Sequence, residues 1–300
     1  MTRPVAYRRH ASPAVALLAL ALAVPAGCIR GDGPTPAGGP TPPAATGAAA
    51  PASPTGAATT GPARPTAPGT ARPAPPTRSA TPTGLPAALR GVDLTRIPTS
   101  RRVVALTFDA GANADAVPSI LATLGRERVT ATFFLTGDFV TGFPAAARSI
   151  VSAGHRLGNH SVSHPHFPAL SGAQQRAEVL GAERSMREAT GADPRPLFRF
   201  PYGGRDAATI ATVNGLGYVA VRWTVDSLGW QGLASQTAAR VTERVLATAQ
   251  PGQIVLMHVG SHPQDRSTLD ADALPEVIAG LRRQGYGFVT LDVLLQPAGG

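Results

Sequence analysis

The chain from about residue 101 onward alternates short apolar runs with stretches of helical hydrophobic spacing. Residues 103–108 form a run typical of a buried strand, and residues 116–124 follow with helical spacing. The alternation repeats: further strands are expected at 129–135, 156–159, 197–200, 218–225, 253–257 and 287–291, and helices at 144–153, 173–189, 207–216, 236–249 and 274–284. Strands that alternate with helices pair in parallel and carry the helices outside. We therefore expect an α/β fold whose seven strands close into a barrel somewhat smaller than the eight-stranded kind.

The first 28 residues have the pattern of a signal peptide. Arg3, Arg8 and Arg9 precede an apolar run at 14–24, and small residues lead to Cys28. The run is too short to span a bilayer permanently. Two fates remain open, ordinary cleavage after residue 26 or lipid attachment to Cys28. Because Cys28 is the single cysteine, we expect no disulfide to hold the fold.

Residues 29–98 consist largely of Pro, Ala, Thr, Gly and Ser, with few large apolar side chains. Such a segment buries too little surface to offset its conformational entropy, so we expect a disordered linker ahead of a folded domain at 99–300. The net charge of +9 is concentrated in the first 98 residues, which hold nine Arg against two acids. The remainder is close to neutral, which argues against a nucleic-acid-binding surface.

Chemically active side chains follow the ends of the expected strands. These residues are Asp109, His160, His164, Tyr202, Asp226 and His258. In parallel α/β barrels the carboxyl ends of the strands meet on one face, where active sites form. A lone Asp at such a place is often only a helix N-cap, but this many reactive side chains on one face together indicate an active site.

His160 and His164 are separated by Ser-Val-Ser. On a turn of helix this spacing places both imidazoles on one side, where they suit a divalent ion. A structural zinc normally has four protein ligands, so two histidines with open positions favour a catalytic metal site. His155 and His166 lack such neighbours, and we interpret them as structural or surface residues.

Five segments carry recognisable motifs in a fixed order. They are 107–111 (Thr-Phe-Asp-Ala-Gly), 160–164 (His-Ser-Val-Ser-His), 199–203 (Arg-Phe-Pro-Tyr-Gly), 226–230 (Asp-Ser-Leu-Gly-Trp) and 254–258 (Ile-Val-Leu-Met-His). Together they resemble the polysaccharide deacetylases, the NodB-homology or carbohydrate esterase family four enzymes. The resemblance covers about residues 101–294. It implies a distorted (β/α)7 barrel, and removal of acetyl groups from peptidoglycan, chitin or xylan with a bound divalent metal.

The resemblance also implies catalytic roles. His160 and His164 are expected to hold a divalent ion, Zn with Co or Ni as alternatives, that polarises the acetyl carbonyl and acidifies water. Asp109 takes the proton of that water as general base, and His258 protonates the departing amine. The backbone N–H of Tyr202 stabilises the oxyanion.

Supporting roles follow from the same resemblance. Arg199 keeps Asp109 ionised by charge pairing, and Asp226 favours the charged form of His258. Leu256 and Trp230 form a small apolar pocket for the acetyl methyl group. Trp230 is equally compatible with a plain core position.

The chain departs from the family pattern at two positions. Ala110 stands where most members have a second Asp that serves as third metal ligand. The two histidines are then left with water, Asp109 or Asp115 as further ligands, and weaker metal binding is expected. Gly229 stands where an acid often precedes Trp230, which we interpret as a change in loop packing or substrate contact.

The sequence therefore predicts a metal-dependent N-deacetylase, monomeric and active on an acetylated cell-wall glycan. Peptidoglycan is the expected substrate, with chitin or xylan as alternatives, and nucleic acid is not an expected partner. The protein is expected outside the cytoplasm, secreted, wall-associated or anchored to the membrane through Cys28. A non-catalytic glycan-binding module stays open if Ala110 abolishes metal binding. A metallopeptidase lacks support, because no Glu lies between the histidines in the HExxH manner.

Overall fold

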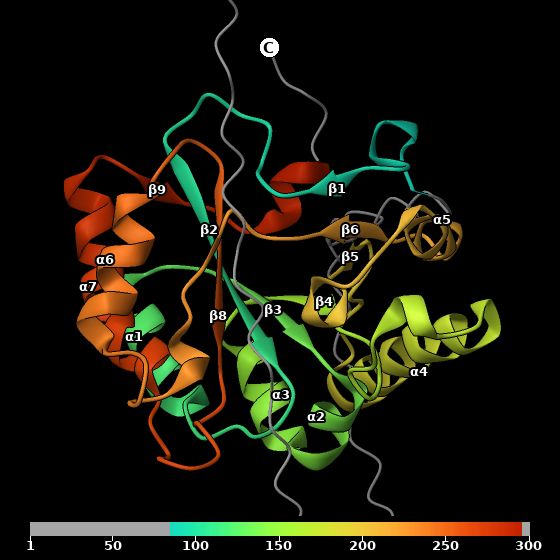
Figure 1. Cartoon of the computed structure of the whole chain (residues 1–300), viewed down its shortest axis with the longest axis horizontal. Helices are drawn as coiled ribbons and strands as arrows, with labels where there is room; N and C mark the ends of the chain where they lie inside the picture. Colours follow the sequence, from blue (N-terminus) through green and yellow to red (C-terminus); the bar gives the residue numbers. More distant parts are fainter. Residues whose placement is uncertain (1–84, 296–300) are drawn as a thin grey trace, which may run out of the picture. The chain divides into compact units, whose positions relative to one another are not determined.

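The computed structural model describes residues 85–295 (Figure 1). The predicted signal peptide and the linker up to residue 84 lie outside the described residues. The strands are β1 (Asp93–Leu94), β2 (Val103–Ala110), β3 (Thr132–Leu135), β4 (Arg156–Asn159), β5 (Leu197–Phe198), β6 (Val219–Val221), β7 (Val225–Asp226), β8 (Gln253–His258) and β9 (Gly287–Phe288). The helices are α1 (Val117–Glu127), α2 (Gly137–Gly142), α3 (Pro144–Ser152), α4 (Gly172–Thr190), α5 (Ala207–Gly215), α6 (Ala238–Ala247) and α7 (Leu269–Arg283). Short 3₁₀ helices are η1 (Ala87–Leu89), η2 (Phe167–Ala169), η3 (Pro201–Gly203), η4 (Gly229–Gln231) and η5 (Leu291–Leu295).

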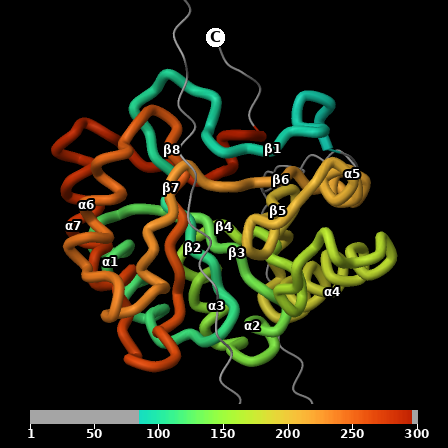
Figure 2. Tube along the Cα trace, viewed as in Figure 1, coloured from blue at the N-terminus to red at the C-terminus, as the bar shows by residue number. Residues whose placement is uncertain are grey.

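The strands form one sheet in the order β1-β6-β5-β4-β3-β2-β8-β7, and β9 pairs with the start of β2. Every pairing between these strands is parallel. The helices lie outside the sheet, with α6 and α7 on one side and α4 and α5 on the other (Figure 2). The predicted alternation of strands and helices, with parallel pairing, is confirmed.

The sheet curls so that its two ends approach each other. β6 lies near one end of the strand order and β7 at the other, yet only residues 222–224 connect them. Because a chain spans at most about 3.6 Å per residue, the end of β6 and the start of β7 lie within about 14 Å of each other. This confirms the distorted barrel. The strand expected at 218–225 is divided instead, because the Arg222 N–H donates to Leu94 at 2.7 Å and the Thr224 N–H donates to Ile254 at 2.8 Å.

The fold includes residues that we expected in the linker. β1 pairs with β6, and Leu85, Leu94 and Ile97 are buried. The boundary expected at residue 99 is therefore wrong, and the packed structure includes Leu85. These few apolar side chains stand among glycine, proline and polar residues. Only Leu94 belongs to the two-residue strand β1, which is too short to show a periodicity in the sequence.

Two helices differ from the sequence expectation. The short helix α2 was missed; the Thr136 side chain caps it by accepting a hydrogen bond from the Phe139 N–H at 3.0 Å. Helix α7 begins at Leu269 and not at residue 274, with Pro275 inside it. Proline normally marks the first turn of a helix, because it lacks the N–H that an interior position donates. The additional turn of α7 brings Asp270 into the fold next to β8.

Alternate residues of each strand face opposite sides of the sheet. Phe108 belongs to the apolar cluster that includes residues of the outer helices. Ala105 of β2 and Ile254 of β8 belong to a second cluster, which contains no residue of an α helix. Asp109 follows Ala105, and His258 follows Ile254, by an even number of residues. Both therefore face the inner side of the barrel, at the carboxyl ends of their strands.

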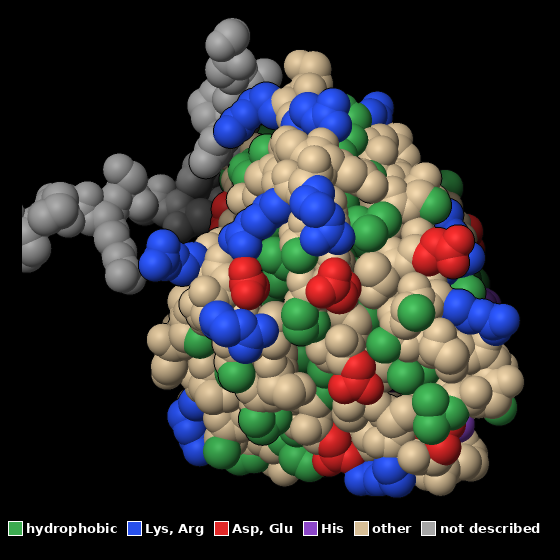
Figure 3. Space-filling model, turned by 90° about the vertical axis from the view of Figure 1, so that its left-hand side faces the viewer, with side chains coloured by type: hydrophobic (Ala, Val, Ile, Leu, Met, Phe, Trp, Pro, Cys, Tyr) green, Lys and Arg blue, Asp and Glu red, His purple; other side chains and the backbone are tan. Residues whose placement is uncertain are grey.

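The outer face that carries α6 and α7 mixes basic and acidic side chains (Figure 3). Among residues 85–295, no helix has both the length and the apolar composition needed to cross a membrane.

Candidate active site

Asp109 and Arg199 form a buried ion pair at the carboxyl ends of β2 and β5. The Arg199 side chain is fully buried, and Nη1 lies 2.6 Å from Asp109 Oδ1. Its guanidinium also donates to the Arg222 carbonyl at 3.0 Å and lies 4.1 Å from the centre of the Phe134 ring. Burial alone would raise the pKa of Asp109, but the charge of Arg199, with smaller contributions from His160 and His258, holds it below its usual value. Asp109 is therefore an ionised carboxylate at neutral pH, in the form that a general base requires.

His160 faces the other oxygen of the same carboxylate. Its Nε2 lies 3.4 Å from Asp109 Oδ2, and its Nδ1 lies 2.8 Å from the Arg199 carbonyl oxygen. A carbonyl only accepts, so Nδ1 carries the proton in the neutral ring and Nε2 keeps its lone pair. Burial holds the pKa of His160 below its usual value against the opposing charge of Asp109. The ring is thus neutral, as metal ligation needs.

His164 completes the pair, but not on a turn of helix as expected. Residues 160–164 form an irregular loop, in which Ser161 has φ 69° and His164 has φ 60°. The two rings nevertheless meet, with centroids 4.8 Å apart. The helical expectation is wrong because Asn159 Oδ1 accepts the Ser161 N–H at 2.9 Å, which favours a turn in place of helix. Burial, together with the neighbouring His160, lowers the pKa of His164 to about 4.

A side chain of α4 holds this loop in place. Glu178 Oε2 accepts hydrogen bonds from the N–H groups of Val162 at 2.8 Å and Ser163 at 2.9 Å. Its Oε1 accepts from the Ser163 hydroxyl at 2.9 Å. Sequence reasoning missed Glu178, because it lies in the middle of a predicted amphipathic helix and has no motif around it.

His258 lies beside Asp109 in strand register, since β2 and β8 pair Asp109 with His258. The carboxylate that faces its ring is Asp270 from α7, whereas Asp226 favours the charged ring as expected but contributes less. Asp270 Oδ2 accepts the His258 backbone N–H at 2.8 Å and lies 3.5 Å from Nδ1. Burial alone would lower the pKa of His258, but Asp270, with smaller contributions from Asp109 and Asp226, raises it.

The Asp226 carboxylate accepts hydrogen bonds from residues of its own loop. Its two carboxylate oxygens accept the Leu228 N–H at 2.9 Å and the Trp230 indole N–H at 3.3 Å. The short β7 ends at Asp226, and the following chain turns through Leu228 with φ 62°. A carboxylate held by an Asx turn is typical of such a connection, so Asp226 shapes the loop that presents Trp230.

The sequence matches the family "polysaccharide deacetylase" over residues 96–221. Over 199 residues it is 33% identical to a peptidoglycan-N-acetylglucosamine deacetylase of Bacillus cereus, covering 66% of this chain and 70% of the relative. The chain belongs to the polysaccharide deacetylase family. It is also 39% identical over 194 residues to a chitooligosaccharide deacetylase of Bradyrhizobium, covering 62% of this chain and 87% of that protein. Among solved structures, a family 4 carbohydrate esterase pseudoenzyme from Bacillus anthracis matches with a TM-score of 0.63 and 29% identity, covering 69% of this chain and 70% of that one.

The three residues that the resemblance assigns to the oxyanion and acetyl pocket differ in exposure. Tyr202 is 72% exposed, has φ 56° and lies with its ring centre 4.5 Å from that of His164. Trp230 is 50% exposed, which excludes the core position that the sequence left open. Leu256 is buried and lies two residues before His258 on the same face of β8.

The two family departures have structural counterparts. Ala110 is fully buried in the apolar cluster next to the helices. Asp115 is held by other groups, since its Oδ2 lies 2.5 Å from both the Ser261 hydroxyl and Arg266 Nη2. Within residues 85–295 it forms no metal-binding group with the two histidines, so the alternative in which Asp115 is the further ligand is not supported.

The His160 and His164 rings, whose centroids lie 4.8 Å apart, offer imidazole donors of the kind that a divalent ion binds. Within residues 85–295, no group of three or more His, Cys, Asp and Glu side chains has the geometry of a metal site. His160 Nε2 and Asp109 Oδ2, however, are two electron-pair donors that face each other at 3.4 Å. Such a contact repels unless a cation lies beside it, and imidazole with carboxylate is a donor pair that zinc accepts.

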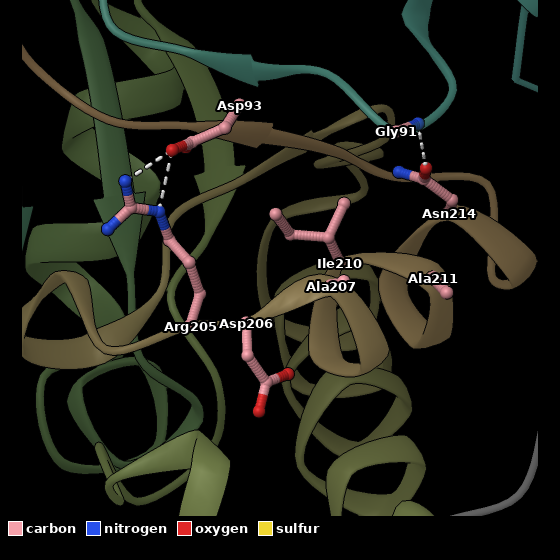
Figure 4. A pocket seen from close by; sticks show the side chains of 8 residues that line it. All are labelled: Gly91, Asp93, Arg205, Asp206, Ala207, Ile210, Ala211 and Asn214. Carbon is pink, nitrogen blue, oxygen red and sulfur yellow. Dashed lines mark hydrogen bonds and ion pairs between the residues drawn. The ribbon is translucent and has the colours of Figure 1, made fainter.

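His155 and His166, which the sequence predicts to be structural or surface residues, have other surroundings. His155 is buried, and its Nδ1 accepts the Ala131 N–H at 3.3 Å, which is a structural contact. His166 is exposed. A cavity of about 500 Å³ lies elsewhere, between the N-terminal segment and α5, where Arg205 pairs with Asp93 (Figure 4). None of the catalytic or pocket residues predicted from the sequence lines it.

Proposed function

We propose that this chain is a metal-dependent N-deacetylase that acts on the glycan strands of the bacterial cell wall. The observation that carries the proposal is the register pairing of Asp109 with His258, which sets an ionised carboxylate beside an imidazole of raised pKa at one rim of the barrel. The Asp109 carboxylate can accept a proton and the protonated His258 ring can donate one. A hydrolysis that uses a general base first and a general acid afterwards needs both groups at one site.

His160 and His164 hold the metal. When bound there, a divalent ion, zinc with cobalt or nickel as alternatives, supplies Lewis acidity for the acetyl carbonyl and the attacking water. Asp109 removes a proton from that water, and Arg199 keeps the carboxylate ionised for this step. The backbone N–H of Tyr202 donates to the oxygen that becomes negative. His258 then gives its proton to the amine nitrogen as the carbon–nitrogen bond breaks.

The substrate is peptidoglycan. The similar proteins are deacetylases of peptidoglycan N-acetylglucosamine and of chitooligosaccharides, which both contain N-acetylated amino sugars. The exposed Tyr202 offers apolar surface beside His164, and the exposed Trp230 offers it beside Asp226. The predicted signal peptide and linker place the domain outside the cytoplasm, either released or anchored at Cys28. The protein acts as a monomer and does not bind nucleic acid.

A second candidate is a glycan-binding module without catalysis. Ala110 at the third-ligand position and the similarity to a pseudoenzyme favour it. The complete Asp109, Arg199 and His258 arrangement weighs against it, since glycan binding alone needs no general base or acid.

Acetate release decides between the two candidates. The full chain is incubated with peptidoglycan, chitin oligomers and acetylated xylan, with and without a chelator, and acetate is measured enzymatically. We expect release from peptidoglycan, its loss with the chelator, and its recovery when zinc is added back. His160→Ala is expected to abolish release, whereas His166→Ala, which removes an exposed histidine, should match the wild type. Peptidoglycan binding with no acetate release at any metal concentration would establish the module.

A further inference from the structure

The contact between Asp270 and His258 joins two parts of the chain that the motifs do not connect. Asp270 lies in the first turn of α7 and is 4% exposed. Its Oδ2 accepts the backbone N–H of His258 at 2.8 Å and also faces Nδ1 of the ring at 3.5 Å. One carboxylate oxygen therefore meets both the main chain and the imidazole of the same residue.

The space that holds this carboxylate exists because residue 229 is glycine. A Cβ atom at Gly229 would lie 2.4 Å from Asp270 Oδ1 and 2.6 Å from its Cγ. Gly229 has no positive φ that would require glycine. The Asp270 carboxylate thus explains why residue 229 has no side chain. The space between them can hold a side chain from residue 229 or from residue 270, but not from both.

The charge of Asp270 requires a cationic partner. Its Oδ1 is buried and has no hydrogen-bond partner among the described residues, and an ionised carboxylate in such a place is costly unless it is paired. The first turn of α7 lends the partial positive charge of a helix N-terminus. The titratable cation that faces the carboxylate is His258, whose Nδ1 is also buried without a hydrogen-bond partner in this part of the chain.

We propose that Asp270 is the positioning residue of the general acid His258, and that Gly229, which has no side chain, leaves the space for its carboxylate. This inference rests on the proposed function. Asp270 attracts the proton of Nδ1 and fixes the ring, so that Nε2, on the far side of the ring, is left for the leaving group. When the carbon–nitrogen bond breaks, its electron pair takes the Nε2 proton, and the ring becomes neutral while Nδ1 keeps its proton.

Three charged groups act on the His258 ring besides the helix terminus. Asp270 comes from α7, Asp109 from β2 and Asp226 from β7, and all three favour the protonated ring. Only Asp270 also contacts the His258 main chain. Loss of Asp270 should therefore change both the orientation and the protonation of the ring, whereas the other two carboxylates keep other partners.

The test compares Asp270→Asn with Asp272→Asn in the full chain. Asp272 is an exposed acid of the same helix turn, so its variant removes the same charge without touching His258. For Asp270→Asn we expect kcat for acetate release to fall about tenfold or more with KM nearly unchanged, and the high-pH limb of the profile to move to lower pH. The His258 ring resonances, followed by NMR in protein without added metal, should titrate at lower pH than in the wild type.

A relocation experiment separates positioning from folding. Asp270→Ala empties the space above Gly229, and the double variant Gly229→Asp/Asp270→Ala returns a carboxylate to it from the opposite side. We expect the double variant to be several-fold more active than Asp270→Ala, whereas Gly229→Asp alone should lose activity through the clash. Equal His258 titration in Asp270→Asn and Asp272→Asn would overturn the inference. If the wild type releases no acetate, the proposed function fails, and the NMR comparison still supports or overturns the Asp270–His258 contact.

Discussion

Arg199 is fully buried, and Asp109 is the carboxylate that its guanidinium meets at 2.6 Å. The Asp109 carboxylate, which is the general base of the proposed reaction, is thus also the counter-ion of the buried Arg199. Removing one partner of such a pair leaves the other charge desolvated and alone. Catalysis and stability are therefore coupled at this residue.

Asp109→Asn should lower kcat by about 100-fold or more, because the amide cannot accept the proton of water. The same change should reduce the free energy of unfolding by about 3–5 kcal/mol, the usual cost of breaking a buried pair. Kinetics of acetate release and denaturant unfolding measure the two effects separately. The exposed Asp138→Asn is the control, and a variant with normal acetate release would remove Asp109 from the role of base.

The residues that could be predicted are those whose role is local to a strand end. Asp109 and His258 each follow an apolar run directly, and His160 follows the short strand at 156–159, so the order of strands sets all three on one rim. Asp270 and Glu178 could not be found in this way. Asp270 contacts His258, and Glu178 contacts the loop at 160–164, only because their helices pack there. The sequence of a helix does not indicate which loop its side chains will contact.

At the scale of elements, the loop at 160–164 has no regular structure of its own and depends on α4. Two positive φ angles, at Ser161 and His164, are costly for residues with side chains. The hydrogen bonds that Glu178 accepts offset this cost. The histidine pair is therefore arranged by a neighbouring helix as much as by its own spacing.

Glu178→Ala should weaken zinc affinity about tenfold, since contacts that orient the ligand-bearing segment affect metal affinity to this extent. Calorimetric titration of the full chain with zinc measures the change. Glu188→Ala removes an exposed acid from the same helix and should bind zinc like the wild type. An unchanged affinity in Glu178→Ala would show that the loop keeps its shape without α4.

The N-terminal segment with β1 is a second element on which the barrel depends. Leu85, Leu94 and Ile97 are buried in the inner cluster, and each contributes about 1.5–3 kcal/mol when removed from water. A chain that starts at Arg101 should therefore unfold at a clearly lower temperature than one that starts at Pro75. Circular dichroism melting compares them, and equal midpoints would contradict a structural role for β1.

At the scale of the whole molecule, the architecture was predictable because parallel pairing follows from the order of strands and helices. The way the barrel closes was not. The crossing at residues 222–224 depends on carbonyl groups of Leu94 and Ile254, which lie far away in sequence. A single apolar run at 218–225 therefore looked like one strand, although its two halves serve opposite ends of the sheet.

The position of β8 late in the chain has a consequence for biosynthesis. Asp109 lies in β2 and the two histidines in the loop after β4, and these strands associate through β3, whereas His258 and Asp270 come more than ninety residues later in the chain. A nascent polypeptide that folds from its N-terminus gains its base before its acid. In the proposed mechanism, catalytic competence is thus acquired last, because a chain that ends before β8 has the general base and no general acid.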